Sequence, residues 1–521
     1  MKKRILKTLF LTLFLTLFLT YTYTFNVQAS TVDYIAGKDR YETAAMISDR
    51  LNYSTAIIVN GLSIADGLSA SGLSGSLNAP ILLTTANSLP SSTMKKLNTA
   101  DKIYLVGGNG VISPEIETTI KKLGKKVIRL GGKDRYSTSH IVADEINKIK
   151  GINEIYYVNG LTGEADAMSI APVAAEKGNP VILTDGKKTN YLKDVKSYAI
   201  GGTGVLKPYF DSFAERIGGL DRFETNSKVI KKFFPNKKHV NLSKSHVLID
   251  ALTASALKEP VVLINDSSDK SIIAGAKSAT VLGNISPVAV KRAKSYIFND
   301  KVVFYSQHQD DETIFAGSAI IDAVEAVGAE NVYIVLISDG DESGIFLDER
   351  YRNLTVDEKT ELRNNEFKAA TKQLGVLGEN LIFLNQPENN IYEKVVINTM
   401  LELESEFESI THITHSYKYD LHNQHLKTGQ TLYNLYKNGL IKDCRFFGRK
   451  ELIPTHNQKA LIESVSDNKK EKDKLIKAIK EYKLDNKDMV REGIGYKSVK
   501  NLFDALTSDP NNTSYLHEPG L

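Results

Sequence analysis

The chain has 521 residues, of which 42% are hydrophobic and 25% charged, so it is long enough for several domains with buried cores. Its single cysteine, Cys444, excludes an intramolecular disulfide and therefore a disulfide-stabilised scaffold. The formal net charge of +4 comes from four basic residues in the first 29 positions, and the rest of the chain sums to zero.

Residues 1–29 are predicted to be a secretory signal peptide. Met1–Arg4 is basic, residues 9–20 repeat Leu-Phe-Leu-Thr, and Ala29 ends a small-residue cleavage pattern. The alternative is a retained membrane anchor, which the threonine interruptions disfavour. No other apolar run is long enough for a bilayer, so we expect a secreted chain with no membrane span after cleavage. Export without disulfides is typical of a bacterial protein.

The charge is distributed unevenly along the chain. Residues 30–300 carry 35 Lys and Arg against 26 Asp and Glu, whereas residues 301–521 carry 27 against 36. A basic front half predicts an anionic partner. Nucleic acid is not expected outside the cell, which leaves an anionic surface polymer. The alternative is an ordinary solvated surface, since the excess is spread over the whole front half.

A motif recurs three times in this front half. It reads Gly-Lys-Asp-Arg-Tyr-Glu-Thr at Gly37–Thr43 and returns with substitutions at Gly132–Thr138 and Gly219–Thr225. Short apolar strands and helical stretches alternate in each copy, which predicts a parallel α/β sheet in each unit. We place the units at residues 30–125, 126–213 and 214–297, followed by a different domain at 298–521.

The Asp-Arg pair of the motif has two interpretations. Asp39 and Arg40 can form an ion pair within the unit or contact a ligand, and every unit keeps the pair. The order of motifs resembles the type 2 cell-wall-binding repeats of clostridia and related Gram-positive bacteria, over roughly residues 31–290. The resemblance implies non-covalent attachment to an anionic cell-wall polysaccharide through residues 30–297. In the third unit Leu220 and Phe223 replace the Lys and Tyr of the motif. We expect these substitutions to affect the ligand contacts of this unit more than its fold.

The second half has a different pattern. We expect strands at 302–306, 331–337, 380–384 and 410–416, helices at 313–327, 360–374 and 468–487, and a loop from residue 508 to the end. This alternation predicts a Rossmann-like open α/β sheet. Ligands of such sheets bind beyond the carboxyl ends of the strands.

Two clusters of metal-binding residue types lie at predicted strand exits. His308 and Asp311 follow the strand 302–306 at a spacing that lets both face one metal ion, with Asp310 free to act as a base. A catalytic zinc takes three protein ligands, so a third must come from a distant segment, where His422 and His425 are available. Without the second cluster, the acidic residues Asp310–Glu312 are also typical of a helix N-terminus. His412 and His415 alternate with other residues and are interpreted as strand residues.

Ser306–Glu312 resembles the Ala-His-Pro-Asp-Asp-Glu signature of the LmbE-like (PIG-L) zinc deacetylases, which remove the N-acetyl group of GlcNAc-type sugars. The resemblance covers roughly residues 300–500. It implies that His308, Asp311 and His425 bind Zn²⁺ and that Asp310 is the general base. His422 would then stabilise the oxyanion or help to protonate the leaving amine.

Three further positions enter this resemblance. Arg363 would hold substrate, although an ion pair with Glu366 is an equally good interpretation. Gln309 and Gln424 replace a proline and an acidic residue of the pattern without removing a ligand. The implied function is a wall-anchored deacetylase of an N-acetylated glycan. The alternatives are a surface structural or adhesive protein with a silent hydrolase domain, and an enzyme for a small N-acyl glycoside or a peptide-like amide.

Overall fold

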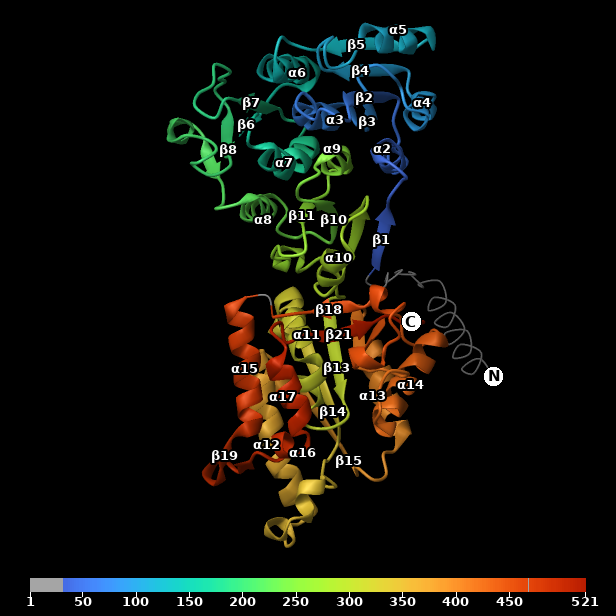
Figure 1. Ribbon diagram of the computed structural model, residues 1–521, viewed down its shortest axis with the longest axis vertical. Helices are drawn as coiled ribbons and strands as arrows, with labels where there is room; N and C mark the ends of the chain where they lie inside the picture. Colours follow the sequence, from blue (N-terminus) through green and yellow to red (C-terminus); the bar gives the residue numbers. More distant parts are fainter. Residues whose placement is uncertain (1–30, 467) are drawn as a thin grey trace, which may run out of the picture.

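The computed structural model describes residues 31–466 and 468–521, and the predicted signal peptide lies outside them. Three small α/β units lie at one end of an elongated molecule and a larger α/β domain lies at the other (Figure 1). Across the described ranges, no helix has both the length and the apolar character needed to cross a bilayer. Together these units confirm the predicted α/β class.

Each small unit is a four-stranded, all-parallel sheet. The strands, in sheet order, are β3 (Ile81–Thr84), β2 (Thr55–Asn60), β4 (Lys102–Val106) and β5 (Lys126–Leu130); β7 (Val181–Thr184), β6 (Glu154–Asn159), β8 (Lys196–Ile200) and β9 (Glu215–Ile217); and β11 (Val261–Ile264), β10 (His239–Lys244), β12 (Ser278–Leu282) and β1 (Thr31–Ile35). The helices are α2 (Arg40–Ser48), α3 (Ala70–Leu77), α4 (Ser91–Leu97), α5 (Pro114–Lys122), α6 (Arg135–Lys150), α7 (Glu164–Lys177), α8 (Arg222–Phe233), α9 (Ile249–Ala254) and α10 (Pro287–Lys294).

The three units close into a ring by sharing strands. The fourth strand of each sheet is the segment that precedes the next copy of the repeated motif, so β5 and β9 complete the sheets of the first and second units. The third sheet is completed by β1 from the start of the described chain, with Thr31 opposite Ser278 and Ile35 opposite Leu282. One hydrophobic core runs through all three units.

The Asp-Arg pair of the repeated motif helps to build this ring. Asp39 caps α2 by accepting a hydrogen bond of 2.8 Å from the Glu42 backbone N–H. Arg40 donates from Nη1 to the carbonyl oxygen of Gly61 over 2.6 Å. The other two units repeat both contacts, through Asp134 with Ser137, Arg135 with Gly160, Asp221 with Glu224, and Arg222 with Ser245. The Asp and the Arg therefore have separate structural partners.

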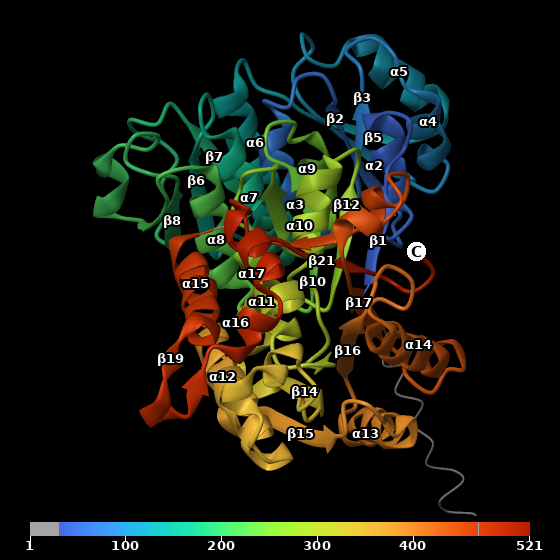
Figure 2. The same cartoon turned by 60° about the horizontal axis from the view of Figure 1, so that its bottom comes forward.

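The second half forms a seven-stranded sheet with helices on both faces (Figure 2). In sheet order its strands are β15 (Leu381–Gln386), β14 (Val332–Ser338), β13 (Lys301–Ser306), β16 (Ile410–His415), β17 (Cys444–Phe447), β21 (Ser514–His517) and β18 (Ile462–Ser464). One face packs against α11 (Asp311–Val327), α12 (Val356–Leu374), α15 (Lys469–Lys483) and α17 (Lys500–Ser508). The other packs against α13 (Glu393–Glu406) and α14 (Asn423–Lys437), while β19 (Asp485–Asn486), β20 (Arg491–Glu492) and α16 (Ile494–Ser498) lie near α12.

The predicted strands and the helices at 313–327 and 360–374 are confirmed, the helix predicted at 468–487 ends earlier, at Lys483, and one prediction is wrong. The segment after residue 508 is not all loop, because Ser514–His517 forms β21 and pairs antiparallel with β17 and β18. Four residues carry too little periodicity to be recognised as a strand. Leu516 is buried because it joins the hydrophobic core on the sheet face that α11 covers.

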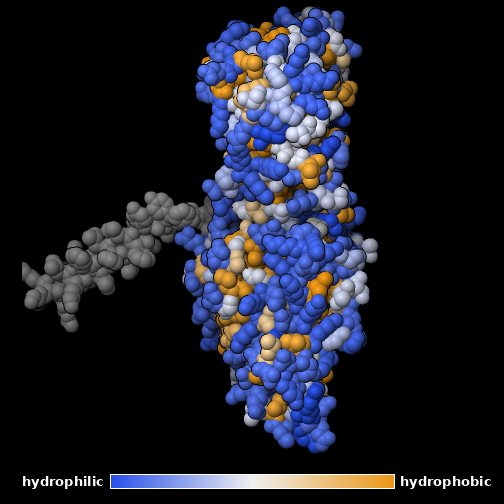
Figure 3. Space-filling model, turned by 90° about the vertical axis from the view of Figure 1, so that its left-hand side faces the viewer, coloured by the Kyte–Doolittle hydropathy of each residue, from blue (hydrophilic) through white to orange (hydrophobic). Residues whose placement is uncertain are grey.

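The third small unit packs directly on the large domain. Lys291 of α10 pairs with Glu463 of β18 over 3.0 Å, and Lys277 pairs with Asp300. Tyr296, Ile297 and other residues of the connecting segment are buried. On the face shown in Figure 3, hydrophobic residues are scattered among hydrophilic ones over both ends of the molecule.

Candidate active site

The site lies where the order of strands reverses in the large sheet. The chain passes from β13 outward through β14 and β15, then returns to β16 on the other side of β13. The loops that follow β13 and β16 therefore meet at one edge of the sheet, which is where open α/β sheets bind ligands. The backbone N–H of Gln307 lies 3.2 Å from His415 Nε2 and joins the two strand ends.

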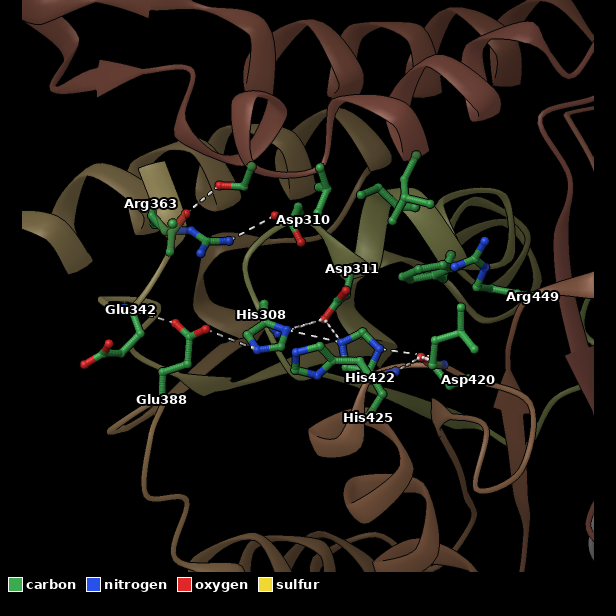
Figure 4. Close-up of a pocket in the computed structure, with 18 residues that line it drawn as sticks. His308, Asp310, Asp311, Glu342, Arg363, Glu388, Asp420, His422, His425 and Arg449 are labelled. Atoms are coloured by element: carbon green, nitrogen blue, oxygen red, sulfur yellow. Dashed lines mark hydrogen bonds and ion pairs between the residues drawn. The ribbon is translucent and has the colours of Figure 1, made fainter. Parts of the chain in front are cut away.

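Three donor atoms meet between these loops. His308 Nδ1, Asp311 Oδ2 and His425 Nε2 lie 3.2 Å from one another in all three pairs (Figure 4). All three residues are buried. The structure thus brings the three predicted metal ligands together: His308 from the turn after β13, Asp311 from the first residue of α11 and His425 from α14.

This donor set fits a tetrahedral metal ion such as zinc. Ligand atoms placed 2.0–2.2 Å from a tetrahedral ion lie about 3.3 Å apart, close to the spacing observed here. Gln424 Oε1 lies 2.8 Å from His308 Nε2, and Asp420 Oδ2 lies 3.1 Å from His425 Nδ1. These partners leave the other nitrogen of each ring for the ion, the usual arrangement around metal-binding histidines.

Asp311 is held in its charged form. Burial opposes ionisation, but His425 and His415 outweigh it and hold the pKa of Asp311 well below its ordinary value. Its Oδ2 also accepts a hydrogen bond of 2.9 Å from the backbone N–H of His308. A carboxylate with these partners is suited to bind a cation.

Asp310 has an unusual backbone and a single cationic partner. Its φ is 140°, a region that residues with a side chain rarely adopt and that often marks functional sites. Burial raises its pKa well above the ordinary value, and Arg363 opposes this rise. Arg363 Nη2 lies 3.0 Å from Asp310 Oδ2 and donates to the Gln309 carbonyl oxygen over 2.7 Å.

The interpretation of Arg363 as a partner of Glu366 is wrong for this geometry. Glu366 instead accepts hydrogen bonds of 2.7 and 2.8 Å from the backbone N–H groups of Ile494 and Gly495, at the start of α16. Arg363 is buried beside Asp310 and lines the pocket. A spacing of three residues on a helix would allow an ion pair between Arg363 and Glu366. In the structure the Glu366 carboxylate instead binds the start of α16, more than a hundred residues later in the chain.

The pocket above the donor atoms has a volume of about 380 Å³. His422 lines it and is exposed, and its ring centroid lies 4.9 Å from that of His308 and 4.6 Å from that of His425. Partial desolvation of the ring, reinforced by these two neighbours, lowers the pKa of His422 to about 4. Glu388 and Arg449 add charges of opposite sign to the lining (Figure 4).

Sequence reasoning missed several side chains around the site. His415 is the last residue of β16, as expected of a strand residue, yet its ring stacks 3.8 Å from that of His425 and its Nε2 lies 3.4 Å from Asp311 Oδ2. Asp420 and Glu388 also contact the site histidines. The position of His415 at the end of a strand was the available signal. Nothing local marks Glu388, which reaches the site from the loop after β15.

Comparison with known proteins identifies both halves. Residues 35–117, 129–210 and 216–323 match Cell wall binding domain 2 (CWB2), over just more than half of the chain. The chain belongs to the CWB2 family. Residues 303–436 match the GlcNAc-PI de-N-acetylase (PIG-L) family, so a PIG-L domain follows the three CWB2 repeats. The third CWB2 match runs into this domain, where the structure places residues from 301 onward in the seven-stranded sheet.

The chain is similar to two curated proteins of Bacillus subtilis (strain 168). It is 28% identical to "N-acetylmuramoyl-L-alanine amidase LytC" over 56% of this chain and 64% of that protein. It is 30% identical to "Amidase enhancer" over 48% of this chain and 37% of that protein. The chain therefore spans less than two thirds of the length of either relative.

The chain is also similar to parts of several solved structures. Cwp8 from Clostridium difficile is 29% identical with a TM-score of 0.48 and covers 51% of each chain. Cwp6 from the same organism is 23% identical with a TM-score of 0.47, over 74% of this chain and 64% of that one. N,N'-diacetylchitobiose deacetylase from Pyrococcus horikoshii is 16% identical with a TM-score of 0.32, over 43% of this chain and 85% of that one.

Proposed function

We propose that this protein is a wall-associated, zinc-dependent deacetylase that hydrolyses the N-acetyl group of GlcNAc-type sugars in a surface or wall glycan. The observation that carries the proposal is the set of three donor atoms, 3.2 Å from one another, on the wall of a pocket that also exposes the Asp310 carboxylate. The PIG-L match supports the reaction class.

His308, Asp311 and His425 would hold the zinc ion through Nδ1, Oδ2 and Nε2. When bound there, zinc would polarise the acetyl carbonyl and bring the pKa of a water molecule to about 7. Gln424 and Asp420 fix the orientation of the two imidazole rings from behind.

Asp310 would act as the general base that takes the proton of the attacking water. Its carboxylate lines the pocket one residue before Asp311, and the ion pair with Arg363 fixes its direction. A positioned base typically contributes about 10²–10⁴-fold to the rate. Arg363 would then orient the base, with its remaining guanidinium surface toward the substrate.

His422 would stabilise the oxyanion or help to protonate the leaving amine. Its ring faces the pocket beside both ligand histidines and, unlike them, is exposed. The bond between the acetyl carbon and the sugar nitrogen breaks, water supplies the oxygen, and the products are acetate and a free amine.

The CWB2 ring would hold the enzyme on an anionic wall polysaccharide. Residues 30–300 carry nine more basic than acidic residues, which favours a polyanion. Export through the predicted signal peptide would place the chain at the Gram-positive cell wall. The alternative, a surface protein with a silent hydrolase domain, predicts lost site residues, whereas His308, Asp310, Asp311, His422 and His425 all line one pocket.

The test is deacetylation of chitooligosaccharides by the purified full chain without its signal peptide. We expect equal amounts of acetate and free amine, a large loss in Asp310→Asn, and no change in Glu349→Gln, which alters an exposed carboxylate on the same domain. A zinc-loaded protein that releases no acetate from any N-acetylated glycan would contradict the proposal.

A further inference from the structure

The joint between the third and first units of the ring contains a cavity, and in the other two sheets a tyrosine occupies the matching central position. Its volume is about 460 Å³, within the range of small-molecule sites. Its lining comes from β1, β10 and β12, from the segment after α2, and from the turn before β11. None of these residues belongs to the candidate active site.

The rows of residues across the three sheets explain the cavity. In the second sheet Tyr156, Tyr198 and Glu215 lie side by side, and the first sheet places Tyr104 at the central position. The corresponding row of the third sheet is Asn241, Thr280 and Asp33. Thr280 therefore stands where both other units have a tyrosine, and Asn241 stands where the second unit has Tyr156.

The helix over the third sheet is also the shortest. α6 and α8 have 16 and 12 residues, and they reach the tyrosines of their sheets through Glu145 and Phe233. α2 has nine residues and ends at Ser48, so Arg50 and Leu51 lie beyond its end. Loss of both the rings and the last helical turns leaves the space open.

The lining offers hydrogen-bond groups of both kinds. Asp33 accepts from Thr280 over 2.5 Å and from Arg50 over 2.8 Å. Asn241 donates from Nδ2 to Glu259 over 3.2 Å. Asn241 is fully buried, and within the described part of the chain its Oδ1 has no hydrogen-bond partner. A buried acceptor that lines a cavity without a partner is costly unless a ligand or water satisfies it.

The charges select among ligand classes. An anion would face the carboxylates of Asp33 and Glu259, and a small cation would face the guanidinium of Arg50 and the imidazole of His239, which pairs with Glu259 over 3.7 Å. A neutral, hydroxyl-rich ring can donate to the carboxylates and accept from Arg50, while Leu51 and Leu257 contact its apolar face, and a small rotation of the Asn241 side chain toward the cavity would let the ring donate to Oδ1 as well. A sugar residue has this combination of groups.

We propose that this cavity binds one neutral hexose unit of the wall polysaccharide. The proposal deepens the wall-binding half of the proposed function and rests on it, and it is independent of the deacetylase chemistry. It makes the ring asymmetric, with a sugar site at one of its three joints. The anionic groups of the polymer would contact the basic surface outside the cavity.

The experiment uses the full chain without its signal peptide and two variants of the cavity. Glucose, galactose, mannose and N-acetylglucosamine are titrated one at a time, with binding followed by saturation-transfer NMR. Asn241→Leu removes the free acceptor at similar size, and Thr280→Tyr restores the ring that the other units carry. Glu215→Gln is the control, because it changes the same row of the second joint, at the position that corresponds to Asp33.

We expect at least one hexose to bind saturably, at least ten-fold more weakly in both cavity variants and unchanged in the control. Unaltered thermal unfolding and acetate release would show that the variants are folded; if Thr280→Tyr does not fold, Glu259→Gln replaces it. No hexose binding, or binding that survives both substitutions, would overturn the proposal.

A second arm identifies the source of the sugar. Co-sedimentation with isolated cell walls should weaken in the cavity variants if the hexose belongs to the wall polymer. Unchanged sedimentation would overturn that part of the proposal. Failure of the unaltered chain to sediment would contradict the wall-binding function itself, while the titrations with free hexoses would still decide whether the cavity is a sugar site.

Discussion

Asp166 in the second CWB2 unit should make the ring less stable at neutral pH than in mild acid. It is buried, and burial raises its pKa from 3.8 to about 6, although Thr225 and Arg222 oppose the rise. Each tenfold change in proton affinity is worth about 1.4 kcal/mol, so the raised pKa corresponds to about 3 kcal/mol. The folded chain holds this proton more tightly than the unfolded chain. The contribution is therefore complete below pH 3.8 and is lost as the pH rises through about 6.

The substitution Asp166→Asn removes this titration at nearly constant size. We expect it to raise the free energy of unfolding by up to about 3 kcal/mol at pH 7 and to change it little at pH 4. Urea unfolding followed by circular dichroism between pH 4 and 8 measures the difference. Asp194→Asn, an exposed aspartate of the same unit, is the control. A difference between Asp166→Asn and the unaltered chain that does not vary with pH would refute the reasoning.

Three further predictions concern the site and the ring. Asp310→Asn should lower acetate release by about 10²–10⁴-fold while the protein still binds zinc, as measured by parallel rate and metal assays; equal loss of metal would make Asp310 a ligand and not a base. Ile35→Ala, which removes a buried side chain of β1, should destabilise the ring by about 2–4 kcal/mol in urea unfolding and leave the zinc content unchanged. Tyr482→Phe removes a hydrogen bond of 2.7 Å to the buried Glu312 carboxylate and should lower the free energy of unfolding by about 1–3 kcal/mol. A free energy of unfolding equal to that of the unaltered chain at every pH from 5 to 8 would show that this contact is not formed.

The elements of the large domain could be predicted because their signals are local. The strand 302–306 is a continuous apolar run, and the metal-binding residue types follow it directly, so β13 and the start of α11 are visible in the sequence. His422 and His425 could be proposed because they follow another strand of the same sheet, and the resemblance to the PIG-L family singled out His425 as the third ligand. His415 was not proposed, because alternation in a strand indicates burial and says nothing of which buried residue lies at the end of the sheet.

The contacts that could not be predicted from the sequence are those between segments far apart in the chain. The repeated motifs show three units, but no local pattern indicates that β1 pairs with β12, about 250 residues away, and closes the ring. The same holds for Glu366, whose partner is the start of α16 and not its neighbour Arg363. The cavity beside Asn241 could not be predicted for the same reason. It combines β1, from the start of the repeats, with polar residues of β10 and β12 in the third unit.

The measurement that tests the account most directly is the zinc content of the purified full chain, compared with that of His308→Ala and His425→Ala. Elemental analysis should find about one zinc per chain in the unaltered protein and almost none in either variant, with acetate release lost in parallel. Retention of zinc in both variants, or its absence from a folded unaltered chain that still releases acetate, would contradict the claim that His308, Asp311 and His425 form the catalytic metal site.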